Sequence, residues 1–357
     1  MQGDSDPPSH RSPHAGGRAT VELRALGELG VLARIRTAVG KTRSTGVRIG
    51  IGDDTAVLAV TPGTSLLATT DLLVEDIHFR RAWASPADIG WKAMAVNLSD
   101  VASMGGVPRW ALVAAALPAT AEVQEIDALY EGLLAAATPH GVTIVGGDTS
   151  TSRLGWTINV TLLGEHSGAP KLRSAASPGD VVAVTGSLGR AAAGLALLEQ
   201  GSTTALSAQT QDALTRAHLR PMPRLAEGRW LGEQPGVHAM MDLSDGLSTD
   251  LGHICRESDV GARIALDRLP IPPAVREAAD ALGRDPSEWA AAGGEDYELL
   301  LTCAADMVER LAEGLRAATG TALTAIGRIE PREASVTYVD ARGEPVLLRG
   351  GYQHFHG

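Results

Sequence analysis

The sequence predicts a mixed α/β (α+β) protein of two domains. Apolar, strand-like runs alternate with stretches of helical spacing from about residue 21 onward, which is typical of domains that combine helices with sheets. With 357 residues, of which 44% are hydrophobic and 20% charged, the chain favours two cores over one. The alternation restarts after the turn Pro178-Gly179-Asp180, so we expect one domain over residues 21–164 and a second over residues 165–357.

The beginning of the chain differs from the rest. Residues 1–20 are rich in Pro, Ser, Gly and His and lack periodicity, so we expect a disordered leader outside the fold. Residues 21–39 have helical spacing. In the first domain we then expect strands over 47–52, 65–70, 110–117, 142–145 and 156–164, and helices over 87–104 and 121–137. In the second we expect strands over 181–185, 238–242 and 297–302, helices over 191–199 and from 247, and a helical stretch ending near 231.

The charge balance restricts the function. Acidic residues exceed basic ones by 42 to 31, which gives a net charge of −11 and argues against nucleic acid or an anionic membrane as partner. Lysine occurs only at Lys41, Lys92 and Lys171, so a protein of this kind that handles phosphate needs metal ions for positive charge. No stretch approaches the roughly 18 apolar residues of a membrane helix, and the start carries no secretory core, so we expect a cytoplasmic protein. The two cysteines, Cys255 and Cys303, are expected to be buried thiols.

Three apolar runs of the first domain lead into an aspartate: Asp54 after Gly50-Ile51-Gly52-Asp53, Asp71 after Thr69-Thr70, and Asp148 after Gly146-Gly147. A single example is typical of a solvated turn. Three of them are expected to gather carboxylates at one edge of a sheet without a compensating lysine. Hard cations such as magnesium prefer oxygen ligands of this kind.

The predicted helix over residues 87–104 carries Asn97 and Asp100 on one face, among residues typical of a core. A carboxylate on a largely apolar face needs a partner. The alternative is that Ser99 or Asp100 caps the start of a second, short helix.

The second domain repeats the pattern. An apolar strand leads into Asp242-Leu243-Ser244-Asp245, and Gly246 then opens a helix whose N-terminal amides can receive anionic oxygen. Helix capping by Ser244 or Asp245 is the alternative, and it leaves Asp242 unexplained. Glu295 follows a pair of glycines before another strand, where an ordinary hairpin turn would give the same residues. The segment Gly40-Lys41-Thr42 is no phosphate loop, because the glycine which that motif needs five residues earlier is Ile35.

Together, these motifs resemble a known family. The strings are GIGDDTAVL, TTDLLVEDIHF, KAMAVNLSDVASMGG, VGGDTS, VTGSLG, MDLSDGLSTDL and GGEDYELL. In this order they resemble the thiamine-monophosphate kinases, whose fold is shared with aminoimidazole ribonucleotide synthetase, and the similarity runs from about residue 26 to the end. Individually the motifs are weak, and most mark the wider superfamily. His78 and the terminal Gly351-Tyr352-Gln353-His354-Phe355 narrow the resemblance toward the kinases.

The resemblance implies transfer of the γ-phosphate of ATP to thiamine monophosphate, with several magnesium ions. It implies a homodimer in which strands of the first domain from both chains form a barrel, and a C-terminal α/β sandwich. The implied metal ligands are Asp54, Thr69, Thr70, Asp71, Asp100, Asp148, Asp242 and Asp245. The implied ATP-binding residues are Tyr130, Gly147, Asp148, Arg173 and Ser244, and the implied substrate-binding residues are His78, Glu295 and Tyr352.

The chemistry needs no strong general base, because a phosphate oxygen of the acceptor is already ionised near neutral pH. We therefore assign no acid or base, and a lone histidine flanked by Ile77 and Phe79 is more often a packed residue than a base. Two alternatives remain open. One is an ATP-dependent ring-closing ligase like aminoimidazole ribonucleotide synthetase, and the other is a non-catalytic nucleotide or magnesium sensor.

Overall fold

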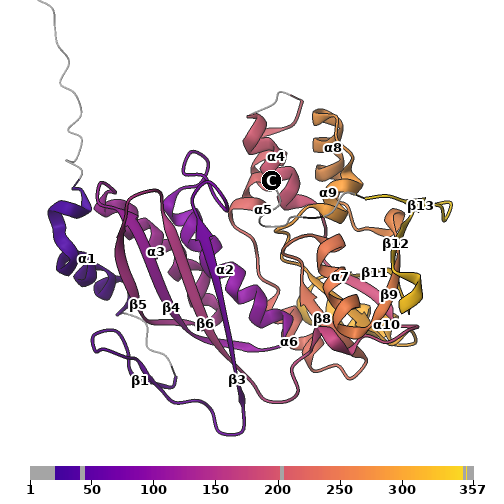
Figure 1. The fold of residues 1–357 in the computed structure, drawn as a ribbon, viewed down its shortest axis with the longest axis horizontal. Helices are drawn as coiled ribbons and strands as arrows, with labels where there is room; N and C mark the ends of the chain where they lie inside the picture. The colour runs from indigo at the N-terminus through magenta and orange to yellow at the C-terminus, as the bar shows by residue number, and fades with distance from the viewer. Residues whose placement is uncertain (1–20, 41–44, 202–204, 349–350, 352–357) are drawn as a thin grey trace, which may run out of the picture.

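The computed structural model describes residues 21–40, 45–201, 205–348 and 351. Residues 1–20, predicted as a leader, and Tyr352, predicted to bind substrate, lie outside this range. Figure 1 shows two parts side by side, an N-terminal part up to strand β6 and a C-terminal part from strand β7 onward. None of the helices described is long and apolar enough to cross a membrane.

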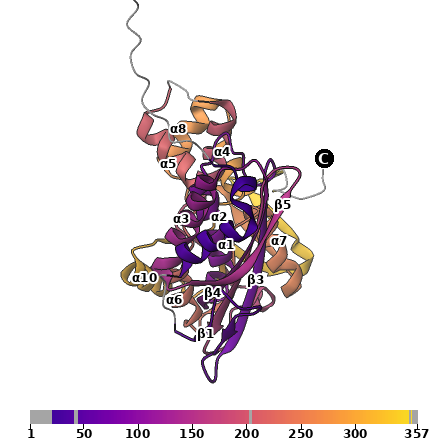
Figure 2. The same cartoon turned by 90° about the vertical axis from the view of Figure 1, so that its left-hand side faces the viewer.

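The N-terminal part is built on a four-stranded sheet with the strand order β3-β6-β4-β5. Strands β4 and β5 run parallel, while β6 is antiparallel to both of its neighbours. The bounds are β3 (Ser65–Val74), β4 (Val107–Pro118), β5 (Thr143–Ser152) and β6 (Thr157–His166). A separate two-stranded sheet joins β1 (Val47–Ile49) to β2 (Val57–Leu58). Helices α2 (Pro86–Ser103) and α3 (Val123–Ala137) lie together against one face of the four-stranded sheet (Figure 2), and α1 (Leu23–Val39) packs beside α3.

The other face of this sheet, here called the uncovered face, is largely open, although residues of α1 and of the β1–β2 segment line a cavity over part of it. Side chains alternate along β6, so that Ile158, Val160 and Leu162 are buried against the helices while Asn159 and Thr161 face the opposite side. On this opposite side, the large apolar side chains Leu66, Leu72 and Leu112 are exposed by 49%, 50% and 37%. Large apolar side chains exposed on one face of a sheet are compatible with a surface that another chain covers.

Helix α2 is central to the molecule. It starts with a capping box, in which Ser85 accepts a hydrogen bond from the Asp88 amide and Asp88 accepts one from the Ser85 amide, and Pro86 occupies the first turn. The helix is buried along most of its length because it packs on the sheet, on α3 and on elements of the C-terminal part. It continues without a break through Ser99 and Asp100. The alternative of a second helix starting there is therefore wrong.

The C-terminal part contains a seven-stranded sheet with the order β13-β12-β9-β11-β7-β10-β8, antiparallel except between β9 and β12. Its strands are β7 (Val181–Thr185), β8 (Val237–Asp242), β9 (Val260–Ala265), β10 (Leu299–Cys303), β11 (Leu323–Pro331), β12 (Val336–Val339) and β13 (Pro345–Val346). Its helices are α4 (Arg190–Gln200), α5 (Ala208–Leu219), α6 (Leu225–Gly232), α7 (Leu247–Ser258), α8 (Pro273–Leu282), α9 (Pro286–Ala292) and α10 (Val308–Thr319).

Helices cover both faces of this larger sheet. Val182 and Val184 of β7 pack in one apolar cluster with residues of α4, α7, α8 and α9. Val181 and Ala183 belong to the other cluster, which includes Leu311 of α10 and is continuous with the core of the N-terminal part. Cys255 and Cys303 are buried and free, as expected.

Several predicted elements differ from the observed ones; the strand predicted over residues 47–52, for example, ends at Ile49. Strands β3 and β5 do not end at the predicted positions but run on through Asp71 and Asp148, since residues 72–74 and 149–152 continue to pair with β6 and β4. The helical stretch ending near residue 231 is two helices, α5 and α6. They are separated by Pro221 and Pro223, which cannot donate to a helix ladder. The strand predicted from Tyr297 starts at Leu299, because Tyr297 has a positive φ of 51°.

Candidate active site

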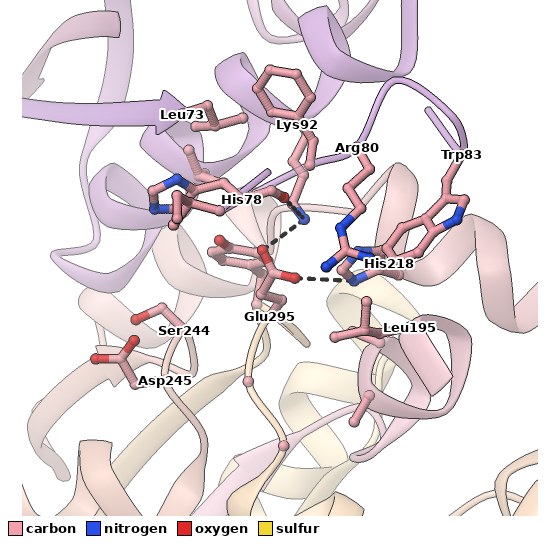
Figure 3. A pocket seen from close by; sticks show the side chains of 18 of the residues that line it. Leu73, His78, Arg80, Trp83, Lys92, Leu195, His218, Ser244, Asp245 and Glu295 are labelled. Carbon is pink, nitrogen blue, oxygen red and sulfur yellow. Dashed lines mark hydrogen bonds and ion pairs between the residues drawn. The ribbon is translucent and has the colours of Figure 1, made fainter. Parts of the chain in front are cut away.

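A cavity of about 740 Å³, here called the central pocket, lies between the N-terminal and C-terminal parts. It is lined by β3 and the turn after it, by α2, α4 and α5, and by the two loops around residues 244 and 295. It brings together five of the predicted site residues from distant positions in the sequence: Asp71, His78, Ser244, Asp245 and Glu295. Figure 3 shows Glu295 near the middle of this pocket, with Ser244 and Asp245 toward one side and Trp83 and His218 toward the other.

Three carboxylates form an acidic cluster beside the central pocket: Asp71 of β3, Asp100 of α2 and Asp242 at the end of β8. Thr69 donates a hydrogen bond to Asp100, and Ser99 Oγ donates one to Asp242 Oδ2 at 2.7 Å. Burial and the nearby charge of Asp100 raise the pKa of Asp71 to about 7 and that of Asp242 to about 7. Burial also raises the pKa of Asp100. The three groups therefore repel one another when ionised.

The donor set of this cluster fits magnesium. It consists of carboxylate and hydroxyl oxygens, and hard cations prefer these. Within the described residues, no group of three or more His, Cys, Asp or Glu side chains is arranged as a ready-made metal cage. Magnesium is usually bound by one or two carboxylates together with water and substrate phosphates. The positive group nearby is Arg173 of the short 3₁₀ helix η2 (Arg173–Ala175), whose charge acts on Asp100.

The loop that carries Ser244 and Asp245 is fixed by its own backbone. Gly246 has a φ of +103° and starts α7, a conformation that L side chains rarely adopt. The Asp250 side chain accepts hydrogen bonds from the amides of Asp245 and Gly246, at 3.2 and 3.1 Å. The Glu295 amide donates to the Ser244 carbonyl at 2.8 Å. The two loops that line the pocket thus hold each other in place.

Glu295 has two basic partners. Its Oε1 atom lies 2.6 Å from Nζ of Lys92, and its Oε2 atom lies 3.0 Å from Nδ1 of His218. Burial opposes the charge on this carboxylate, but Lys92 and His218 outweigh that effect and lower the pKa of Glu295 to about 2. Burial and the charge of Lys92 lower the pKa of His218. The pocket therefore contains an ionised carboxylate that lies between Lys92 and His218.

His78 lies in the central pocket, but its ring is already engaged. Nδ1 of His78 accepts a hydrogen bond from the Val74 amide at 3.1 Å, and the His78 carbonyl accepts one from Lys92 at 3.3 Å. This is the packed, hydrogen-bonding role that the sequence favours over that of a base. Aromatic side chains also line the pocket, namely Phe79, Trp83, Trp289 and Tyr297.

Sequence reasoning gave no role to Lys92 and overlooked His218, Trp83 and Trp289. One signal was available: Lys92 is one of three lysines in the chain and lies on a helix that is otherwise apolar around it. A buried lysine requires a carboxylate or carbonyl partner. The identity of that partner, Glu295, depends on the tertiary fold.

Four other predicted residues line a second cavity of about 890 Å³, here called the outer pocket: Asp54, Tyr130, Gly147 and Asp148. This pocket opens on the uncovered face of the four-stranded sheet, where Asn159 and Thr161 contribute to its wall. Thr70 also belongs to this side, because its Oγ1 lies 3.0 Å from Oγ1 of Thr161.

The expectation that Asp54, Asp71 and Asp148 gather at one edge of a sheet is wrong for a single chain. Strands β3 and β5 are the two opposite edges of the four-stranded sheet. Asp71 shares the register of the buried Val160 and so faces the helices, whereas Asp148 shares the register of Ala114 and Asn159 on the uncovered face. The hydrophobic pattern of the sequence could not predict that Asp71 and Asp148 lie at opposite edges, because it does not give the order of strands in the sheet.

Comparison with known proteins supplies the family. Residues 52–166 match the model of the AIR synthase related protein N-terminal domain, and residues 177–340 match that of its C-terminal domain. The chain is 37% identical to the thiamine-monophosphate kinase of Bacillus subtilis over 311 residues, which is 87% of this chain and 94% of that protein. This chain belongs to the thiamine-monophosphate kinase family.

Solved structures of the thiamine-monophosphate kinase family agree with the fold. The thiamine-monophosphate kinase of Stenotrophomonas maltophilia has a TM-score of 0.78 and 36% identity, over 92% of this chain and all of that one (100%). AaThiL complexed with AMPPCP and TMP has a TM-score of 0.73 and 34% identity, over 94% of this chain and 99% of that one. The resemblance and the mixed α/β, two-part fold that we predicted are confirmed. The domain boundary near residue 165 stays a prediction.

Proposed function

We propose that this protein transfers the γ-phosphate of ATP to thiamine monophosphate and so makes thiamine diphosphate, in the cytoplasm where ATP is available. One structural observation carries the proposal. The central pocket joins an acidic cluster suited to magnesium and phosphates to an ionised carboxylate, Glu295, among aromatic side chains. Thiamine monophosphate has a phosphate at one end and a cationic thiazolium with an aminopyrimidine at the other, so the two ends of the pocket fit the two ends of this acceptor.

Each group of residues has a part in the proposed reaction. Asp71, Asp100, Asp242 and Asp245, with the hydroxyl of Thr69, would hold magnesium, and Ser244 and Arg173 would contact the nucleotide. When bound, magnesium neutralises phosphate charge and aligns the attacking and leaving oxygens. Glu295 and His78 would bind the acceptor. No side chain needs to remove a proton, because the attacking phosphate oxygen is already ionised.

The outer pocket fits this scheme only if a second copy of the chain takes part. We propose a homodimer in which the uncovered faces of two four-stranded sheets meet and β3 of each chain lies beside β5 of its partner. Such a barrel would close both free edges and bury Leu66, Leu72 and Leu112. It would also bring Asp54, Thr70, Tyr130, Gly147 and Asp148 of one chain near the acidic cluster of the other.

The test is an acceptor assay with purified protein, ATP and magnesium. We expect thiamine diphosphate and ADP in equal amounts when thiamine monophosphate is supplied, and no ADP release without an acceptor. Formylglycinamidine ribonucleotide is the competing substrate, and closure of its ring would replace the proposed function by a ligase activity. The absence of turnover with either acceptor, together with tight nucleotide binding, would support a sensor instead.

A further inference from the structure

We propose that Lys92 and His218 are positioning residues that orient the Glu295 carboxylate so that it recognises the amino group of the acceptor's pyrimidine. This inference rests on the proposed function and adds the source of its selectivity. It concerns residues for which the family motifs imply no role, on two helices that meet at the pocket.

The geometry links three separate elements through one carboxylate. Lys92 comes from α2 of the N-terminal part, His218 from α5 of the C-terminal part, and Glu295 from the loop after α9. Each carboxylate oxygen has its own basic neighbour, Nζ of Lys92 at 2.6 Å and Nδ1 of His218 at 3.0 Å. Figure 3 shows these two interactions meeting on Glu295 in the pocket. Two contacts on different oxygens fix the plane of a carboxylate, which a single ion pair does not.

The side chains of Lys92 and His218 are more deeply buried than that of Glu295. The side chains of Lys92 and His218 are only 4% and 6% exposed, whereas that of Glu295 is 26% exposed. A carboxylate has about four lone-pair sites, so oxygens that each lie against one basic nitrogen can still accept a hydrogen bond from a ligand in the pocket. A ligand in the pocket can therefore reach Glu295, whereas Lys92 and His218, which also line the pocket, expose little of their side chains.

The backbone makes this arrangement rigid. Glu295 has a φ of +69°, an uncommon conformation for a residue with a side chain, and such strain persists only where the surroundings enforce it. A Cβ atom added to Gly294 would lie 2.5 Å from the Ser244 carbonyl oxygen, so the loop can approach Ser244 only because glycine precedes Glu295. The position of Glu295 is thus set before any ligand binds.

Lys92 also joins the two sides of the acceptor site. It donates to the His78 carbonyl at 3.3 Å as well as to Glu295, so one ammonium group links the turn after β3 to the loop after α9. An ion pair with a purely structural role would be replaceable by apolar packing, often without loss of stability. A positioning role predicts instead that its loss changes the choice of acceptor.

The experiment compares substitution pairs at each supporting residue in the full-length protein. At His218, Asn keeps a donor near the place of Nδ1 and Leu removes it; at Lys92, Arg keeps the charge and Met removes it. The acceptors are thiamine monophosphate and oxythiamine monophosphate, which carries an oxygen in place of the amino group. We measure kcat and KM for both acceptors and KM for ATP, and we check folding by thermal unfolding.

We expect the wild-type protein to prefer thiamine monophosphate by at least about tenfold in kcat/KM. His218→Leu and Lys92→Met should reduce this preference to within about twofold and raise KM for thiamine monophosphate, with KM for ATP changed by less than about twofold. His218→Asn and Lys92→Arg should retain the preference. If the Met variant does not fold, the His218 pair alone decides the question.

The outcomes separate the two proposals. If the wild-type protein makes thiamine diphosphate but the Leu and Met variants keep the full preference, or if KM for ATP rises in parallel, the positioning role is wrong and the kinase proposal stands. If the wild-type protein makes no thiamine diphosphate, the kinase proposal is wrong and the inference built on it is withdrawn as well.

Discussion

Asp71 and Asp148 lie on the two opposite edge strands of one four-stranded sheet and face its opposite sides. Two carboxylates placed in this way cannot share a metal ion within one chain. If both serve the same reaction, as the family resemblance implies, a site must combine Asp71 of one chain with Asp148 of another.

This relationship can be tested with mixed dimers. Asp71→Asn and Asp148→Asn should each abolish activity in the homodimer. Co-expression of the two variants with different tags, followed by two-step purification, isolates dimers with one copy of each. One of their two sites then keeps both carboxylates, so we expect about half of the wild-type kcat per dimer. Mixed dimers that stay inactive would mean that the two residues act within the same chain.

The uncovered sheet face gives a second prediction. Leu72→Glu places a charge in the centre of the proposed dimer interface and should produce monomers without activity, because an unpaired buried charge is costly. Sedimentation velocity measures the change. Leu347→Glu is the control, since Leu347 is 99% exposed and lies just after β13, far along the chain from this sheet. If Leu72→Glu leaves a dimer of normal mass, the contact lies elsewhere.

The acidic cluster predicts how the protein responds to metal. Asp242→Asn should lower kcat by at least about a hundredfold, because a ligand is lost, while the metal-free variant should unfold at the same or a higher temperature than the wild type, because repulsion is relieved. Wild-type protein should gain stability when magnesium and ATP are added together, by about 2.7 kcal/mol at a hundred times Kd. A similar gain in Asp242→Asn would count against a role in metal binding.

The pKa of Glu295 gives a prediction for stability against pH. It is about 2 in the folded protein, compared with about 4.3 for an ordinary glutamate in an unfolded chain. Because the folded value is lower, the carboxylate stabilises the fold above about pH 4.3, and this contribution is lost as the pH falls toward 2. Urea unfolding of wild type and Glu295→Gln should therefore differ most near neutral pH and converge as the medium is acidified. A difference that is constant with pH would contradict this assignment.

The sequence predicts much of the fold and part of the site. The residue types of a short segment were enough to predict its structure where neighbours along the chain determine it, as in the loop from Asp242 to Gly246 at the start of α7. Local chemistry also marked Asp100 as a carboxylate that needs a partner, but its grouping with Asp71 and Asp242 was implied only by the family resemblance. These features depend on periodicity and on the backbone freedom of glycine.

The features that the sequence did not predict depend on the order of strands and on contacts between residues far apart in the chain. The order of strands places Asp71 and Asp148 at opposite edges, and nothing in the local pattern of either strand encodes it. The contacts of Glu295 with Lys92 and His218 join residues that lie far apart in the chain, so no spacing rule could relate them. The extension of β5 was missed because its second half, residues 148–152, is polar, and that of β3 because Thr69, Thr70 and Asp71 interrupt its apolar run.

Helix α2 carries Lys92, which contacts Glu295 in the pocket, and Asp100, which belongs to the acidic cluster beside the pocket. Eight residues of an α-helix span about 12 Å along its axis, and the cap at Ser85 and the packing along its length keep this interval constant. The helix therefore sets a fixed distance between Lys92, where the proposed heterocycle site lies, and Asp100, where the proposed phosphate site lies. If the proposed function holds, an acceptor of a different length would reach one of these two places only by missing the other, so we expect length to contribute to the choice of acceptor.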